Sequence, residues 1–128
     1  MGITYDELDA DGVAQLTLTG LVTRTDHAAF TERVAAQIRA GRLRAVIIDA
    51  SAAEVPASAS FSRDVWEDFL SELGGRPFAY LPPAGHENAQ RQEMIRTLVA
   101  EWDVRFATMA GIAQAHAWCL AQLGPKAH

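Results

Sequence analysis

The chain has 128 residues, of which 49% are hydrophobic and 21% are charged, and its formal net charge is -5. This length and composition are typical of one globular domain that can bury a core without metals or disulfides. An acidic chain offers no basic field for nucleic acid or anionic lipid, so neither is expected as the main partner. The single cysteine, Cys119, excludes an internal disulfide and fits a reducing compartment.

The N-terminal stretch MGITYDELDADG lacks the basic and apolar regions of a signal peptide, and no apolar run is long enough to span a bilayer. We therefore expect a cytoplasmic protein without a membrane span. Residues 1–128 contain no repeat and no long linker, so they are expected to form a single domain, with a frayed tail at 125–128.

Two short strands are expected at residues 3–8 and 12–20, joined at Asp11-Gly12, a dipeptide typical of β-hairpins. Apolar and polar residues alternate in the second strand, so only one of its faces is expected to be buried.

The next segment predicts a helix with Thr25 as its N-cap and Gly41 at its end. Phe30, Val34 and Ile38 recur at every fourth residue and form its apolar face. Three arginines cluster at its C-terminal end, namely Arg39, Arg42 and Arg44. Positive charge there complements the helix dipole, which explains the cluster more simply than a phosphate site does.

The run LRAVIID, residues 43–49, is apolar without alternation, which predicts a strand covered on both faces and ending at Asp49. A loop rich in serine and alanine follows. Residues 61–75 then predict a helix that ends at two glycines, with an apolar stripe made of Phe61, Val65, Trp66, Phe69, Leu70 and Leu73.

The second half predicts two further strand-helix units, with strands at 76–83 and 103–108 and helices at 87–102 and 111–123. Trp102 is expected on the inward face of the first of these helices. The order of elements predicts the α/β class, with a single mixed, mostly parallel five-stranded sheet, an N-terminal β-hairpin and about four helices.

This pattern resembles the STAS fold, and within it the small stand-alone SpoIIAA-like proteins, which are related to CRAL-TRIO lipid-binding domains. The resemblance is carried by the ending EWDVRFATMAGIAQAHAWCLAQL, in which Ala117 and Trp118 hold an Ala-Trp pair that is similar to the one in that branch. It covers nearly the whole chain and rests on core positions, so it implies a fold and association with a protein partner, with no catalytic residues and no cofactor.

Antagonists in the resembled family carry a phosphorylated serine in a DSSG motif, at the start of the helix that follows the third strand. This chain reads EVPASASFSRDVW there, so Ser58 falls at the expected position, with Ser60 beside it, but the Asp and the Gly of the motif are missing. A phosphate at a helix N-terminus would be stabilised by the helix dipole. Helix capping accounts for a serine at this position equally well and more simply.

Asp49, Ser51 and His86 form a second candidate group, because the ends of neighbouring parallel strands open onto the same edge of a sheet. They are expected at the rim of a ligand site, and a Ser-His-Asp hydrolase is the weaker alternative, since the chain has no nucleophile elbow. The four histidines show no metal-binding spacing, and no metal site is expected.

Five aromatic residues form a third candidate group, either as an apolar pocket or as an interface: Phe61, Trp66, Phe69, Trp102 and Trp118. Their spacing is also what ordinary core packing produces. The sequence thus predicts a non-enzymatic domain that acts through protein association, with a possible regulatory role and a possible homodimer. The alternative from another class is a carrier of a small hydrophobic or lipid-like ligand.

Overall fold

The structure, a computed structural model, describes residues 2–6, 10–54, 59–83 and 86–123, and its description of side chains leaves out residues 2, 3, 5, 6, 59–63 and 86–92. The strands are β1 (Gly2–Asp6), β2 (Val13–Leu21), β3 (Ala45–Glu54), β4 (Phe78–Leu81) and β5 (Phe106–Thr108). The helices are α1 (Arg24–Arg39), α2 (Ala59–Leu73), α3 (His86–Glu101) and α4 (Ile112–Leu123).

The strands form one sheet in the order β1-β2-β3-β4-β5, in which β2 to β5 run parallel. β1 pairs antiparallel with β2 along one edge, from Gly2 opposite Thr19 to Asp6 opposite Gln15. The turn expected between these two strands includes residues 7–9, which lie outside the described part of the chain. The predicted α/β class, with four helices and a parallel sheet, is confirmed.

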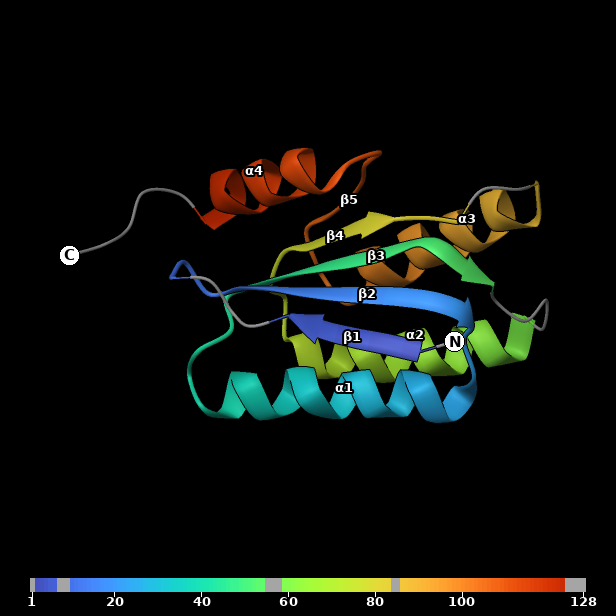
Figure 1. The fold of residues 1–128 in the computed structure, drawn as a ribbon, viewed down its shortest axis with the longest axis horizontal. Coiled ribbons are helices and arrows are strands. Elements are labelled where there is room, and N and C mark those ends of the chain that lie inside the picture. The colour runs from blue at the N-terminus through green and yellow to red at the C-terminus, as the bar shows by residue number, and fades with distance from the viewer. Residues whose placement is uncertain (1, 7–9, 55–58, 84–85, 124–128) are drawn as a thin grey trace.

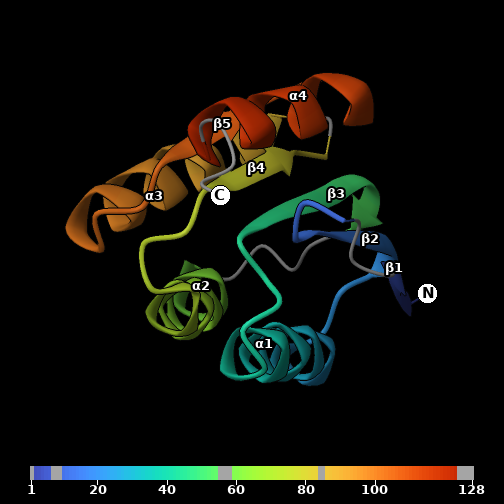
Figure 2. The ribbon, with the colours of Figure 1, turned by 90° about the vertical axis from the view of Figure 1, so that its left-hand side faces the viewer.

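Helices cover both faces of the sheet. Figure 2 shows α1 and α2 side by side on one face and α4 on the other. Helix α3 contributes to the same core cluster as α1 and α2. No helix in the described residues is both long enough and apolar enough to cross a membrane.

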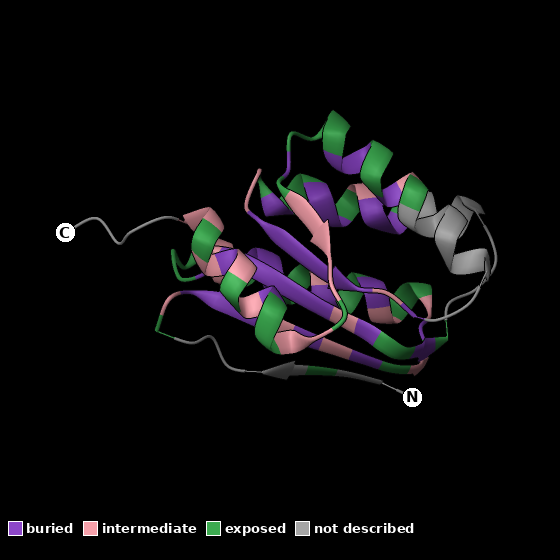
Figure 3. Ribbon diagram, turned by 90° about the horizontal axis from the view of Figure 1, so that it is seen from above, coloured by how far each residue is buried: buried purple, intermediate pink, exposed green. Residues whose placement is uncertain are grey.

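The apolar run of β3 supplies both cores, as its continuous pattern predicts. Val46 and Ile48 face the cluster beneath α1, α2 and α3, whereas Ala45 and Ile47 face the smaller cluster beneath α4. The central strands are therefore coloured as buried along most of their length in Figure 3, whereas the short β5 is only half-buried. In β2, Ala14, Leu16 and Leu18 are buried on the predicted face, but Val13 is also buried, on the opposite face in the cluster beneath α4.

β3 is longer than predicted, because it continues past Asp49 to Glu54. At Asp49 the pairing with β4 ends, opposite Leu81, but the pairing with β2 goes on. The register shifts there, since Thr17 pairs with Asp49 while Thr19 pairs with Ala52, so β3 holds one extra residue. Such a register shift is typical of a β-bulge, and a local apolar pattern does not reveal it because it depends on pairing with a strand that is distant in sequence.

Of the two predictions about the ends of α1, one is wrong and one is confirmed. The N-cap of α1 is Thr23 and not Thr25: the Asp26 N–H donates to Thr23 Oγ1 at 3.2 Å, and the Thr23 N–H donates to Asp26 Oδ2 at 2.9 Å. This reciprocal pair is a capping box, which satisfies two backbone donors at once. The predicted end at Gly41 is confirmed, since Ala40 is the C-cap and Gly41 has a φ of 73°.

Trp102 does not face inward. It follows the end of α3 in a turn, and its side chain is 44% exposed. Asp103, with a φ of 54°, reverses the chain, and the Val104 N–H returns to the Val99 carbonyl at 2.9 Å. Val104 therefore packs in the core, and Trp102 is turned toward solvent.

Candidate functional site

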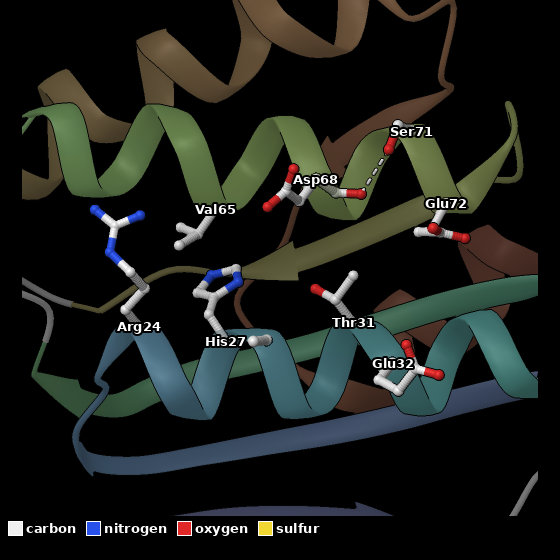
Figure 4. A pocket seen from close by; sticks show the side chains of 9 residues that line it. Arg24, His27, Thr31, Glu32, Val65, Asp68, Ser71 and Glu72 are labelled. Carbon is white, nitrogen blue, oxygen red and sulfur yellow. Dashed lines mark hydrogen bonds between the residues drawn. The ribbon is translucent and has the colours of Figure 1, made fainter.

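A groove of about 410 Å³ runs between α1 and α2, and its lining side chains are drawn in Figure 4. Helix α1 contributes one side through residues spaced by three or four positions, which places them on one face of the helix: Arg24, His27, Ala28, Thr31 and Glu32. Helix α2 contributes the other side in the same way, through Val65, Asp68, Ser71 and Glu72.

The floor of the groove is apolar and includes a buried histidine. His27 is 4% exposed, and its ring lies 4.2 Å from that of Phe30 and 5.0 Å from that of Trp66, measured between ring centroids. Burial lowers the pKa of His27 from 6.5 to about 3, against a smaller opposing effect of the Asp26 carboxylate. The imidazole is therefore neutral near pH 7, and the floor carries no charge.

The walls of the groove are acidic. Three carboxylates, those of Glu32, Asp68 and Glu72, line it together with one guanidinium, that of Arg24. The two arginine-carboxylate contacts nearby are exposed: Arg24 lies 3.7 Å from Asp64, and Arg39 lies 3.3 Å from Glu32. Exposed pairs of this kind contribute little stability, so these side chains can rearrange around a ligand.

Hydroxyl groups complete the walls. Figure 4 shows Thr31 on α1 and Ser71 on α2, and the Ser71 hydroxyl donates to the Asp68 carbonyl at 2.8 Å. The groove thus offers an apolar floor, acidic walls and exposed hydroxyls, a combination that suits a positively charged, partly apolar segment of a partner.

The groove is absent from the sequence-based expectations, in which His27 is noted only as one of four histidines without metal spacing. The order of elements in the sequence could have indicated that α1 and α2 are neighbours. Strands β2, β3 and β4 are consecutive in the sheet, and the helices that connect them therefore lie side by side. Nothing local in α1 or α2 shows which of their faces meet.

The structure brings together two members of the expected Asp49, Ser51 and His86 group. Asp49 Oδ1 accepts the Ser51 N–H at 3.1 Å and the Ser51 hydroxyl at 2.6 Å, which satisfies a backbone donor at the β3 bulge. His86 is the first residue of α3, and its side chain lies outside the described residues. In this contact Ser51 donates to the carboxylate directly, which is not the arrangement of a Ser-His-Asp triad.

Ser51 also borders an open depression of about 340 Å³, lined further by Leu81, Pro82, Thr108, Met109 and Ala110. It lies at the carboxyl ends of β4 and β5, where the sequence predicts the rim of a ligand site, and this role stays a prediction. The strand order follows the sequence without reversal, however, so the sheet lacks the switch point at which α/β proteins form a deep crevice.

The expected serine site lies outside the part of the chain that can be described. This holds for Ser58 as a whole and for the side chain of Ser60, which belongs to the first turn of α2. Capping and phosphorylation at these two serines both remain predictions from the sequence.

The four candidate aromatic residues whose side chains are described do not surround one cavity. Trp66 and Phe69 are buried in the core beneath α1, α2 and α3, and their rings pack edge to face, 5.7 Å apart. Trp118 packs on the opposite face of the sheet, and Trp102 is exposed. The side chain of Phe61 lies outside the described residues. Within the described residues no cluster of three or more potential metal ligands was found.

Comparison with solved structures identifies the fold. The anti-sigma factor antagonist SpoIIAA in its unphosphorylated form matches 91% of this chain and 96% of its own, with a TM-score of 0.64 and 12% identity. An uncharacterised DUF3478 protein with a SpoIIAA-like fold, from Shewanella loihica PV-4, matches 93% of each chain, with a TM-score of 0.61 and 16% identity. An anti-sigma factor antagonist from Mycobacterium paratuberculosis matches 92% of this chain and 94% of its own, with a TM-score of 0.57 and 19% identity.

The chain therefore has the SpoIIAA-like fold, that of STAS domains, as the sequence pattern predicts. No protein-family model and no curated protein sequence matches it.

Proposed function

We propose that this protein is a non-enzymatic domain that acts by binding another protein, in a regulatory role, through the groove between α1 and α2. The observation that carries the proposal is the groove itself, with its neutral, apolar floor and its three wall carboxylates. The solved structures with the same fold include two anti-sigma factor antagonists, which supports a role in protein association.

The charge of the groove selects the kind of partner. Three carboxylates and one guanidinium line it, so its formal charge is negative, and the net charge of the whole chain, -5, is of the same sign. A complementary partner presents lysine or arginine on a segment that also carries apolar side chains for the floor. Charge complementarity of this kind steers association and suppresses wrong partners.

The proposal is tested by affinity capture from the source organism with three baits: wild type, Asp68→Lys/Glu72→Lys and the matched control Glu93→Lys/Glu101→Lys. The control makes the same change of net charge at two exposed carboxylates of α3. We expect wild type and control to capture the same protein. The groove variant should recover about tenfold less of it, or still less.

A zero-length carbodiimide crosslinker then locates the contact. The chain contains one lysine, Lys126, so few internal crosslinks compete. Crosslinks from Glu32, Asp68 or Glu72 to partner lysines are expected. Retention of the same partner by the groove variant, with crosslinks mapped elsewhere, overturns the proposal.

A further inference from the structure

An arginine stands just before each of three neighbouring parallel strands. Arg44 directly precedes β3, Arg76 precedes β4 by two residues, and Arg105 directly precedes β5. Val46 pairs with Phe78, and Phe78 pairs with Phe106, so the three strand starts are in register at one edge of the sheet. These strand starts and the C-terminal ends of α1, α2 and α4 lie at the same end of the molecule, at the left of Figure 1.

The three arginines line a concavity of about 480 Å³ whose lining contains no carboxylate: Gly41, Leu43, Arg44, Gly74, Gly75, Arg76, Pro77, Arg105 and Leu123. A Cβ at Gly41 would meet nothing within 4 Å, whereas a Cβ at Gly74 would lie 2.9 Å from Arg76 Nη1 and one at Gly75 would lie 3.7 Å from the Asp103 carbonyl. The surface is thus open and cationic, in a chain whose net charge is negative.

Two of the arginines are held in place by backbone carbonyls. Arg76 Nε donates to the Leu43 carbonyl at 3.1 Å and Arg76 Nη1 to the Leu73 carbonyl at 2.9 Å. Arg105 Nη1 donates to the Gln122 carbonyl in the last turn of α4. The bonds to Leu73 and Gln122 cap the ends of α2 and α4, and the bond to Leu43 ties Arg76 to the segment before β3. All three bonds orient guanidinium groups that have five N–H donors each, so further donors remain for a ligand.

Arg44 is different, because capping does not account for it. Among the described residues its guanidinium makes no hydrogen bond and no ion pair. Its stem, in contrast, is fixed against Gly12, where a Cβ would lie 2.9 Å from Arg44 Cγ and 3.1 Å from Cδ. The absence of a Cβ at Gly12 therefore leaves room for the aliphatic part of the Arg44 side chain, whose guanidinium can contact a ligand.

We propose that this concavity binds a phosphate monoester dianion, with Arg44 as the residue that contacts the phosphate group directly. Three guanidinium groups outweigh the three helix C-termini, which carry about -0.5 charge each, so a positive field remains. The planar guanidinium matches two phosphate oxygens at once, a geometry that lysine does not offer. The phosphate belongs either to a small molecule or to a phosphorylated side chain. This site is independent of the groove between α1 and α2.

The test is calorimetric titration of the full chain at constant ionic strength, with adenosine monophosphate in one arm and a phosphoserine peptide in the other. The variants are Arg44→Gln, Arg44→Lys and the matched control Arg96→Gln, an exposed arginine of α3 that lies 3.5 Å from Glu93. Glutamine keeps the Cγ and Cδ atoms that pack near Gly12, so the fold is retained, which circular dichroism checks.

We expect wild type and Arg96→Gln to bind at least one probe with equal affinity, and Arg44→Gln to bind it about tenfold or more weakly. The affinity of Arg44→Lys should lie between those of wild type and Arg44→Gln, because lysine keeps the positive charge but cannot contact two phosphate oxygens at once as the planar guanidinium does. Binding in one arm alone identifies the source of the phosphate. The proposal is overturned if neither probe binds at millimolar concentration, or if Arg44→Gln binds as tightly as wild type.

Discussion

Among single residues, His27 shows how strongly burial changes chemistry. A histidine on the exposed side of α1 would titrate near its ordinary pKa of 6.5, but this one is 4% exposed and its pKa is lowered to about 3. Desolvation of the charged form is the main cause, since the aromatic rings of Phe30 and Trp66 replace water around the imidazole.

The first prediction concerns pH and stability. Between pH 6.5 and 3 the unfolded chain binds a proton at His27 that the folded chain does not bind, so acid favours unfolding. The stabilising contribution of neutral His27 is fully present above pH 6.5. Its loss should lower the free energy of unfolding by about 2 kcal/mol as the pH falls from 7 to 5. Urea unfolding of wild type and His27→Phe at the two pH values measures the effect.

His27→Phe should lose this part of the pH dependence. Contributions from carboxylates are common to both proteins and cancel in the difference between them. If the variant loses stability between pH 7 and pH 5 as steeply as wild type does, His27 is not buried in its neutral form.

Among the elements, α1 shows that a helix start depends on a pair of residues. Both Thr23 and Thr25 are good capping residues, but only Thr23 has an acidic residue three positions on, Asp26, which returns a hydrogen bond to the Thr23 N–H at 2.9 Å. The reciprocal pair fixes the first turn two residues earlier than the periodicity of the apolar face suggests.

The second prediction follows from this cap. Thr23→Ala should lower the free energy of unfolding by about 1 kcal/mol, because the Asp26 N–H loses its acceptor. Thr25→Ala is the matched control: Thr25 is exposed in the first turn, and its loss should change stability by less than about 0.5 kcal/mol. Midpoints of urea unfolding check both values. Equal losses of unfolding free energy in Thr23→Ala and Thr25→Ala would show that Thr23 is not the N-cap.

For the whole molecule, strand order decides where the helices lie. Three consecutive connections, through α1, α2 and α3, bury one face of the sheet, and the chain reaches the other face only with α4 after the last strand. The result is one large core and one small core that share a wall, since neighbouring residues of β3, Ile47 and Ile48, belong to different cores.

The third prediction is that the two cores unfold together. Trp66 reports on the large core and Trp118 on the small one, whereas the exposed Trp102 reports on neither. Variants that keep only Trp66 or only Trp118, with phenylalanine at the other two positions, should each show fluorescence and circular dichroism transitions at the same urea concentration, because β3 and β4 belong to both cores. A fluorescence change of Trp118 that precedes loss of the circular dichroism signal would show that α4 detaches first.

Much of the fold was predictable from local pattern. The four-residue recurrence of Phe30, Val34 and Ile38 and the continuous apolar run of Val46 to Ile48 depend only on neighbours within one turn or one strand, and both are confirmed. The order of elements and the C-terminal segment with Ala117 and Trp118 indicated the SpoIIAA-like resemblance, which the solved structures confirm as a likeness of fold. The end of β3 was missed because its last residues are held by pairing with β2, which is distant in sequence.

The candidate sites were less predictable, because each is assembled from segments far apart in the chain. Glu32 and Glu72 share a groove only because α1 and α2 pack together, and Arg44 and Arg105 share a concavity only because three strands start in register. The sequence by itself determined which faces are apolar, because burial of those faces drives folding whatever they meet. Only the tertiary structure decided which polar residues meet, because their positions follow from the packing of the apolar ones.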